Sequence, residues 1–240
     1  MTESPFERRA REQRKKKYKR YAIVGLVTTA LVGLIWFFGF SKTMEITAVE
    51  VSGNDLVSAA AIEKAARLDL NQTLARINTD QIAENVRKVP QVDDVQIKRG
   101  WPRTLKIVVT ERNAIAWFES GNRYQVFDAE GVVFKKSKSK PKGLVEVRAV
   151  KADGKSKEAL SNVAQTINYL ADNSPELSKQ IKFIEVGGQD RITLVMKDRS
   201  SVQWGSAERL ADKLAVLTAL RTIKARVYDV SAPNQPTTRK

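Results

Sequence analysis

A run of twenty residues without a charged side chain, residues 21–40, constrains this chain more than any other feature of its sequence. Twenty helical residues at about 1.5 Å of rise each extend roughly 30 Å, the thickness of the hydrocarbon core of a bilayer. More than half of the run is Leu, Ile, Val or Phe, side chains that favour insertion into lipid. We therefore predict a transmembrane helix over residues 21–40, in contact with membrane lipid.

The charges on either side of this span predict its orientation. Residues 1–20 carry nine Lys or Arg against three Glu, a net charge of +6, whereas residues 41–50 carry one Lys and two Glu. Because positive flanks stay in the cytoplasm, we expect a basic cytoplasmic tail at 1–20 and residues 41–240 outside the cell (inner) membrane. A cleaved signal peptide is the alternative, but its apolar core runs only about 7–15 residues.

The composition excludes several function classes, because the chain has neither cysteine nor histidine. Disulfides, Ser-His-Asp or Cys-His catalysis and imidazole-bound zinc are all excluded, so we expect no catalytic, metal or cofactor site. The net charge of +15 favours anionic lipid, acidic wall polymers or acidic proteins as partners. No motif interleaves aromatic and basic residues, so we expect no nucleic-acid partner.

Residues 45–113 have the pattern of a small domain in the order β-α-α-β-β. A β-branched run ends at a Gly-Asn turn, after which Ser58 is placed to cap a first helix and Asn78 to begin a second. Residues 92–98 and 104–111 then alternate as the two strands of a hairpin. We predict a three-stranded sheet with both helices on one face.

Residues 114–232 consist mostly of short strands separated by turns that contain Gly or Asp. Two apolar stripes at helical spacing interrupt the strands and are expected to face the core. The stripes are Leu160, Val163, Ala164, Ile167 and Leu170, and Leu210, Leu214, Leu217 and Leu220. We predict a mostly antiparallel β-domain with two helices, a flexible tail at 233–240, and an α+β fold for the whole chain.

An ordered set of residues makes the resemblance to a known family specific. In the first domain the set is Val49, Val51, Gly53, Asn54, Pro90, Val92, Val95, Arg99, Trp101, Pro102, Leu105, Ile107, Glu111, Arg112 and Ala116. In the second it is Asp128, Gly131, Val133, Gly205, Lys213, Leu214, Leu217, Asp229 and Pro233. With these residues the first domain resembles a POTRA domain, and the chain resembles the FtsQ/DivIB family of bacterial cell-division proteins. The resemblance implies a non-enzymatic scaffold of the divisome at the division septum.

The resemblance also implies partners and a site for them. The family's partners are the FtsB/DivIC and FtsL coiled-coil proteins and other divisome components, through which septal wall synthesis is regulated. Residues 225–231 form the expected last strand, whose open edge accepts an extended partner segment. Carried over, the partner-binding residues are Arg226, Val227, Tyr228, Asp229 and Val230. The alternative is a strand that its own Pro-rich tail protects.

A second expected surface is a recruitment surface on the POTRA sheet. Its residues are Arg99, Trp101, Glu111 and Arg112. The alternative is a buried hairpin Trp and an exposed ion pair at the end of a strand, a pair that contributes only about 0–1 kcal/mol.

Two Ser-x-x-Lys pairs, Ser137 with Lys140 and Ser139 with Lys142, have the spacing found in penicillin-binding enzymes. They fall in a Lys-rich loop without the companion motifs of those enzymes, so we expect a solvated loop and not a nucleophile. Two further function classes stay open at this point. One is a POTRA-bearing export or assembly chaperone anchored in the membrane, and the other is an anchored enzyme that acts on wall polymers.

Overall fold

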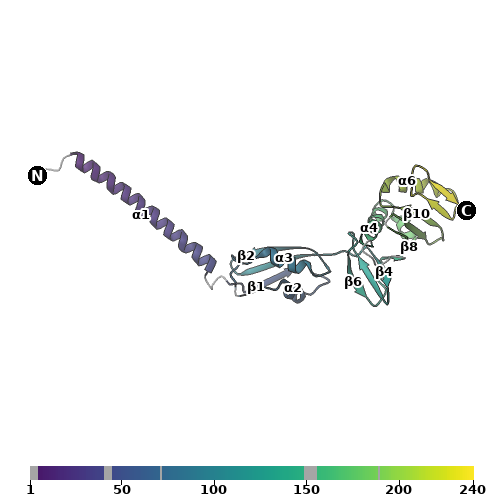
Figure 1. Ribbon diagram of the computed structural model, residues 1–240, viewed down its shortest axis with the longest axis horizontal. Coiled ribbons are helices and arrows are strands. Elements are labelled where there is room, and N and C mark those ends of the chain that lie inside the picture. Colours follow the sequence, from purple (N-terminus) through teal and green to yellow (C-terminus); the bar gives the residue numbers. More distant parts are fainter. Residues whose placement is uncertain (1–4, 41–44, 71, 149–155, 189) are drawn as a thin grey trace. The chain divides into compact units, whose positions relative to one another are not determined.

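A computed structural model describes residues 5–40, 45–70, 72–148, 156–188 and 190–240 (Figure 1). Beyond the N-terminal helix it contains two compact folded parts. The contacts assign residues 1–89 and 94–110 to the first unit, and residues 90–93 and 111–240 to the second.

Helix α1, Pro5–Phe40, contains the apolar run. Its segment Lys17–Phe37 is long and apolar enough to cross a membrane, with a mean hydropathy of 1.7 and no buried residue. Two threonines in this segment bond within the helix. Thr28 Oγ1 donates to Val24 O at 2.8 Å, and Thr29 Oγ1 donates to Gly25 O at 2.8 Å. Both hydroxyls are thereby satisfied without water, as a lipid environment requires.

The rest of the first unit has the predicted β-α-α-β-β order. The elements are β1 (Ala48–Ser52), α2 (Ala59–Ala66), α3 (Thr79–Arg87), β2 (Val92–Gly100) and β3 (Thr104–Glu111). The strands lie in the order β1-β3-β2, and β1 runs parallel to β3 with Ala48 opposite Thr104. Since parallel strands run in the same direction, this pairing places the start of β3 beside the start of β1.

Capping and alternation explain why these residues form this unit. The Ser58 side chain accepts from Ala61 N, and Asn78 Oδ1 accepts from Gln81 N at 3.1 Å, so both helices begin at predicted caps. Along β3, alternate side chains are buried as predicted. They pack in a core with the buried faces of α2 and α3. The core residues include Ile62, Ala66, Ile82, Val86, Leu105, Ile107 and Val109.

The described part of the second unit forms a nine-stranded sheet in the order β12-β11-β10-β9-β8-β7-β4-β5-β6. Its strands are β4 (Ala116–Ser120), β5 (Arg123–Phe127), β6 (Val133–Ser137), β7 (Val145–Arg148), β8 (Ile181–Val186), β9 (Ile192–Met196), β10 (Ser201–Gly205), β11 (Val227–Asp229) and β12 (Thr237–Arg239). Five of the eight neighbouring pairs described are antiparallel, in agreement with the predicted architecture.

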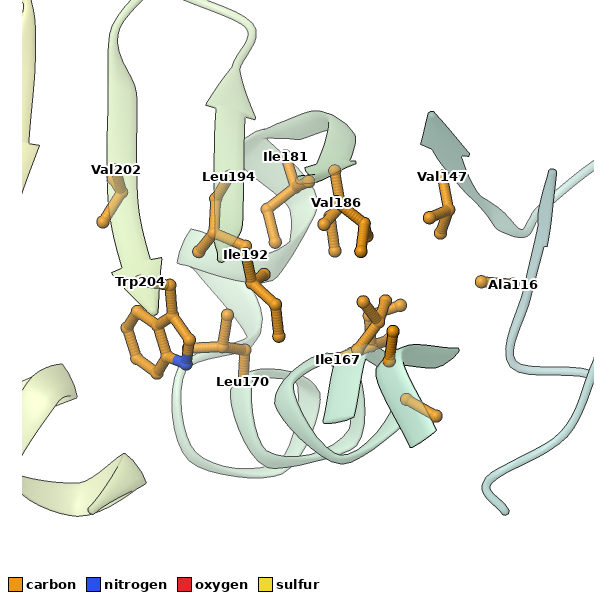
Figure 2. Close-up of a cluster of buried hydrophobic side chains, with 14 of the residues drawn as sticks. Ala116, Val147, Ile167, Leu170, Ile181, Val186, Ile192, Leu194, Val202 and Trp204 are labelled. Atoms are coloured by element: carbon orange, nitrogen blue, oxygen red, sulfur yellow. The ribbon is translucent and has the colours of Figure 1, made fainter. Parts of the chain in front are cut away.

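Helices α4 (Ser156–Asn173) and α6 (Leu210–Leu220) pack on this sheet. Figure 2 shows Ile167 and Leu170 of α4 directed toward Ile192 and Leu194 of β9, with Trp204 beside Leu170. All five residues of the predicted α4 stripe are buried. In α6, only Leu217 of the predicted stripe is fully buried, while the other three leucines pack partly exposed against the same core.

Two local features differ from the sequence-based expectations. A third helix, α5 (Pro175–Gln180), joins the two predicted ones among the described residues of this unit. It is a single six-residue segment that starts at a proline, too short for an apolar stripe to reveal it. The segment 233–240, expected as a flexible tail, contains β12.

Candidate partner-binding site

Strand β11 lies between two other strands, so the expected open edge on it is wrong. It pairs in parallel with β10, where Val202 is opposite Tyr228, and antiparallel with β12, where Thr238 is opposite Tyr228. The parallel pairing requires a crossover, which α6 supplies between β10 and β11. The structure therefore agrees with the alternative, a last predicted strand protected by the tail that follows it.

The turn between β11 and β12 is fixed by polar contacts. Gln235 N donates to Ala232 O at 2.9 Å, and Arg209 Nη2 donates to Asn234 Oδ1 at 3.0 Å. The side chain of Gln203 in β10, oriented to satisfy both partners, donates to Asp229 Oδ2 at 2.7 Å and accepts from Arg239 Nη2 at 3.0 Å. This bridge links β10, β11 and β12 on one face of the sheet.

The five predicted partner-binding residues divide between the core and the surface. Tyr228 and Val230 are buried in the main core, with exposed fractions of 6% and 0%. The Tyr228 hydroxyl donates to Ile223 O at 2.9 Å and accepts from Ala225 N at 3.2 Å. Arg226 is exposed, and Val227 and Asp229 are half-buried. The core residues thus support the edge, and Arg226 is the most accessible of the five.

A basic hollow of about 570 Å³ lies next to this edge. Its lining contains four cations, which are Arg199, Lys224, Arg226 and Lys240, and one carboxylate, Asp198. Hydrogen bonds from the hydroxyl and main-chain N–H of Ser200 lower the pKa of Asp198, as does the charge of Arg221. The Asp198 carboxylate is therefore already engaged, and the other charged side chains of the lining are all cationic.

Little in the sequence predicts the parts of this site other than Arg226. Strand β12 contains only three residues, and its one clue is a pair of β-branched threonines directly after Pro236. Arg199 and Lys224 are far apart in the sequence and meet only because β11 pairs with β10.

The predicted recruitment surface is not one surface. Arg99 and Trp101 lie at the β2–β3 hairpin, whereas Glu111 and Arg112 lie at the other end of β3, roughly 23 Å further along at about 3.3 Å per residue. Trp101 is 54% exposed, not a buried hairpin Trp. Arg99 fixes the turn before α3, because its guanidinium donates to Leu74 O at 3.0 Å and to Ile77 O at 3.1 Å.

Arg112 forms a buried ion pair in the second unit. Its Nη1 lies 2.5 Å from Asp128 Oδ2 and 2.9 Å from Asp93 Oδ1, and the Asp128 side chain is only 3% exposed. The other oxygen of Asp128 accepts from Val132 N at 2.7 Å and from Glu130 N at 3.1 Å, which closes the 128–132 turn. Arg112, expected in an exposed pair at this strand end, is therefore mostly buried and forms a structural contact with Asp128.

The carboxylates of Asp93, Asp128 and Glu130 lie within 4.8 Å of one another, a spacing that a metal ion could bridge. The Arg112 guanidinium already contacts two of these three groups and supplies the compensating positive charge. The cluster is accounted for by this ion pair.

The Ser-x-x-Lys pairs do not bring serine and lysine together as nucleophile and base. Lys140 Nζ lies 3.0 Å from Glu146 Oε2 and 4.8 Å from the centroid of the Trp117 ring. The Ser137 hydroxyl donates instead to Ser139 O at 2.7 Å. Burial raises the pKa of Glu146, but hydrogen bonds from Arg148 and Lys140 outweigh it and lower the pKa overall, so the carboxylate stays charged beside Lys140.

Comparison with known proteins gives consistent matches over both units. Residues 44–112 match the family described as POTRA domain, FtsQ-type, and residues 115–229 match the family described as cell division protein FtsQ/DivIB, C-terminal.

Relatives of this chain include two proteins described as "Cell division protein FtsQ". The protein from Streptomyces bingchenggensis is 30% identical over 95% of this chain and 89% of its own length. The protein from Streptomyces venezuelae is 29% identical over 88% of this chain and 80% of its own length. Among solved structures, the major extracytoplasmic domain of DivIB from Geobacillus stearothermophilus matches at 21% identity. That match has a TM-score of 0.33 and covers 48% of this chain and 99% of that one.

Proposed function

Because the chain belongs to the FtsQ/DivIB family of bacterial cell-division proteins, we propose that it acts as a non-enzymatic scaffold of the divisome. In this role it gathers coiled-coil proteins of the FtsB/DivIC and FtsL types and regulates septal wall synthesis. Helix α1 holds it in the cell membrane, and the net charge of +6 on residues 1–20 supports a cytoplasmic N-terminus. Family membership favours this role over an export or assembly chaperone.

The two edges of the nine-stranded sheet differ in how readily each could accept another strand. Edge strand β6 carries Lys135 and Lys136, both exposed, and lysines on an edge oppose pairing with another chain. Edge strand β12 carries Thr237 and Thr238, β-branched residues that suit an added strand. We therefore assign partner binding to β12, where an extended partner segment adds as a further strand.

The basic hollow beside β12 supports the kind of partner segment that this edge would take. Arg226, directly before β11, lines the hollow together with Arg199 and Lys224. A partner segment with carboxylates next to its added strand would meet these cations. A sheet edge with two threonines next to a cationic hollow is the feature that best supports partner binding at β12.

The proposal is tested by binding of the full chain, in membranes or detergent, to the small coiled-coil partners. Deleting residues 236–240 removes β12 and should abolish binding. Arg226→Glu should weaken binding at least about tenfold, or 1.4 kcal/mol, because it places like charges together. Lys135→Glu reverses a positive charge on the opposite edge strand, β6. It should leave the affinity for the partners unchanged and is the matched control.

Thermal melting of each variant separates binding from folding. Folded β12-deleted and Arg226→Glu proteins that bind the coiled-coil partners at full affinity would exclude β12 as the docking edge. Tighter binding after deletion would show that the partner replaces β12 and does not add to it.

A further inference from the structure

The end of the POTRA unit that carries the β2–β3 hairpin is also the end where the chain enters from α1. Thr47 N donates to Arg103 O at 3.0 Å, and Arg103 Nε donates to Glu45 O at 3.2 Å. The parallel pairing of Ala48 with Thr104 fixes the same arrangement. The hairpin tip, residues 101–103, is therefore attached directly to the first described residues of the unit.

Covalent geometry keeps this tip close to the membrane. Helix α1 ends at Phe40, and Glu45 follows five residues later. Five residues span at most about 18 Å even when fully extended. The headgroup layer adds roughly 5–8 Å outside each face of the hydrocarbon core. The tip is thus within reach of the headgroups of the leaflet in which α1 ends.

The exposed side chains at this end have the chemistry of a membrane interface. Trp101 is 54% exposed, and an indole ring is favoured at headgroup depth. A second exposed apolar residue, Leu70, is 53% exposed and lies two residues before Gln72, whose carbonyl accepts from Ile46 N. Four cations belong to the hairpin or to the segment whose carbonyls Arg99 contacts, and Glu45 and Asp69 supply carboxylates next to these segments. These cations are Arg76, Lys98, Arg99 and Arg103.

We propose that the β2–β3 hairpin is a membrane-contact element in which Trp101 inserts into the headgroup layer of the bilayer that α1 spans. The surrounding cations favour anionic lipid headgroups. A contact this small would be weak for a soluble protein. The α1 tether raises its effective concentration at the surface, so a weak contact is sufficient to hold the POTRA unit against the membrane.

Trp101 fluorescence in the full chain, reconstituted without any partner protein, tests this proposal. Trp36 lies in α1, so the experiment uses a Trp36→Phe background. Of the three remaining indoles, Trp117 and Trp204 are buried in the second unit with exposed fractions of 3% and 0%. The bilayers contain phosphatidylglycerol and phosphatidylcholine brominated high on the acyl chains. In them we expect quenching of up to about one third of the tryptophan emission, because Trp101 is one indole of three.

The double variant Trp36→Phe/Trp101→Phe is the control and should lose this quenching while keeping its melting temperature. Lys98→Gln should reduce the dependence of quenching on phosphatidylglycerol, whereas Lys88→Gln, beyond the opposite end of β2, should not. Equal emission of the Trp36→Phe protein in brominated and ordinary lipid would overturn the proposal. Quenching that persists in the double variant would overturn it as well, because it would come from another indole.

Discussion

The main-chain N–H of Arg226 donates to the main-chain carbonyl of Arg239 across 2.8 Å. This bond begins the pairing of β11 with β12, so the segment after Pro236 completes the sheet where the sequence led us to expect an open edge. It also changes the expected effect of substitutions in β11, from partner binding to folding stability. Tyr228, expected as a partner contact, now serves the stability of the edge.

Replacing Tyr228 should therefore act on folding. Tyr228→Phe removes two hydrogen bonds and leaves the carbonyl of Ile223 and the N–H of Ala225 without that partner, at a cost of about 1–3 kcal/mol. Tyr228→Ala also leaves a cavity, and we expect a loss of about 3–5 kcal/mol. Chemical denaturation of the full chain measures both. A Tyr228→Ala protein of normal stability with lost partner binding would restore the original assignment.

Breaking the Arg112–Asp128 pair should strongly destabilise the second unit. Arg112→Met leaves the buried Asp128 carboxylate without a cation, and we expect a loss of about 3–5 kcal/mol. Asp128→Asn should cost less, because the Arg112 guanidinium keeps Asp93 as an ionic partner. The double variant should lose clearly less than the sum, because neither charge remains unpaired. A double-mutant cycle from denaturation midpoints measures the coupling energy, and additive losses would contradict a direct pair.

Lys213 should make stability depend on pH. It is 2% exposed, and its Nζ donates to Ser206 O at 2.8 Å. Burial lowers the pKa of Lys213 below its ordinary value of 10.5, although the charge of Glu208 opposes the shift. Between the lowered folded-state pKa and 10.5, the unfolded chain binds more protons, so this residue contributes a stability that rises with pH.

Lys213→Met removes the titrating group and keeps an unbranched side chain of similar length. The melting temperature of the wild-type chain relative to this variant should rise as pH increases toward 10.5. Groups common to both proteins cancel in this difference. A difference that stays flat or falls with pH would show that burial does not destabilise the charged form.

Gly131 should be intolerant of a side chain. Its φ is +75°, and a Cβ there would lie 2.2 Å from Lys157 O and 2.6 Å from Ser161 N in α4. Gly121, with a φ of +59°, has nothing within 4 Å of the same position and is the matched control. We expect Gly121→Ala to cost about 1 kcal/mol for its backbone alone, and Gly131→Ala to cost at least about 2 kcal/mol more. Equal melting temperatures of the two variants would contradict the close approach of α4.

The orientation of the chain is tested by protease access. Protease added to spheroplasts should digest residues 41–240 and leave the basic N-terminal segment protected, because positive flanks stay in the cytoplasm. Permeabilised cells control for protease activity toward the N-terminal segment. Protection of the large C-terminal part in intact spheroplasts would reverse the topology.

Patterns that depend on neighbouring residues predicted the structure well. The Ser58 and Asn78 caps, the alternation along β3 and the α4 stripe follow from local geometry and from one buried face. The apolar span follows from length and composition alone.

The features that depend on long-range pairing were not predictable from such patterns. A three-residue strand such as β12 has no periodicity, and its existence depends on the partner strand β11. The burial of Arg112 likewise depends on a partner sixteen residues away, Asp128. An Arg at a strand end is exposed by default, and only the folded turn at 128–132 brings the buried Asp128 carboxylate into contact with it.

The parallel pairing of β1 with β3 has a mechanical consequence for a protein attached to a membrane. A pull from the span reaches the POTRA unit at the start of β1, and the chain leaves that unit past Glu111, at the far end of β3. Force between these two points runs along the strands, so the inter-strand hydrogen bonds are loaded together in shear and do not open one at a time. The unit should therefore resist tension applied between these two points without unzipping.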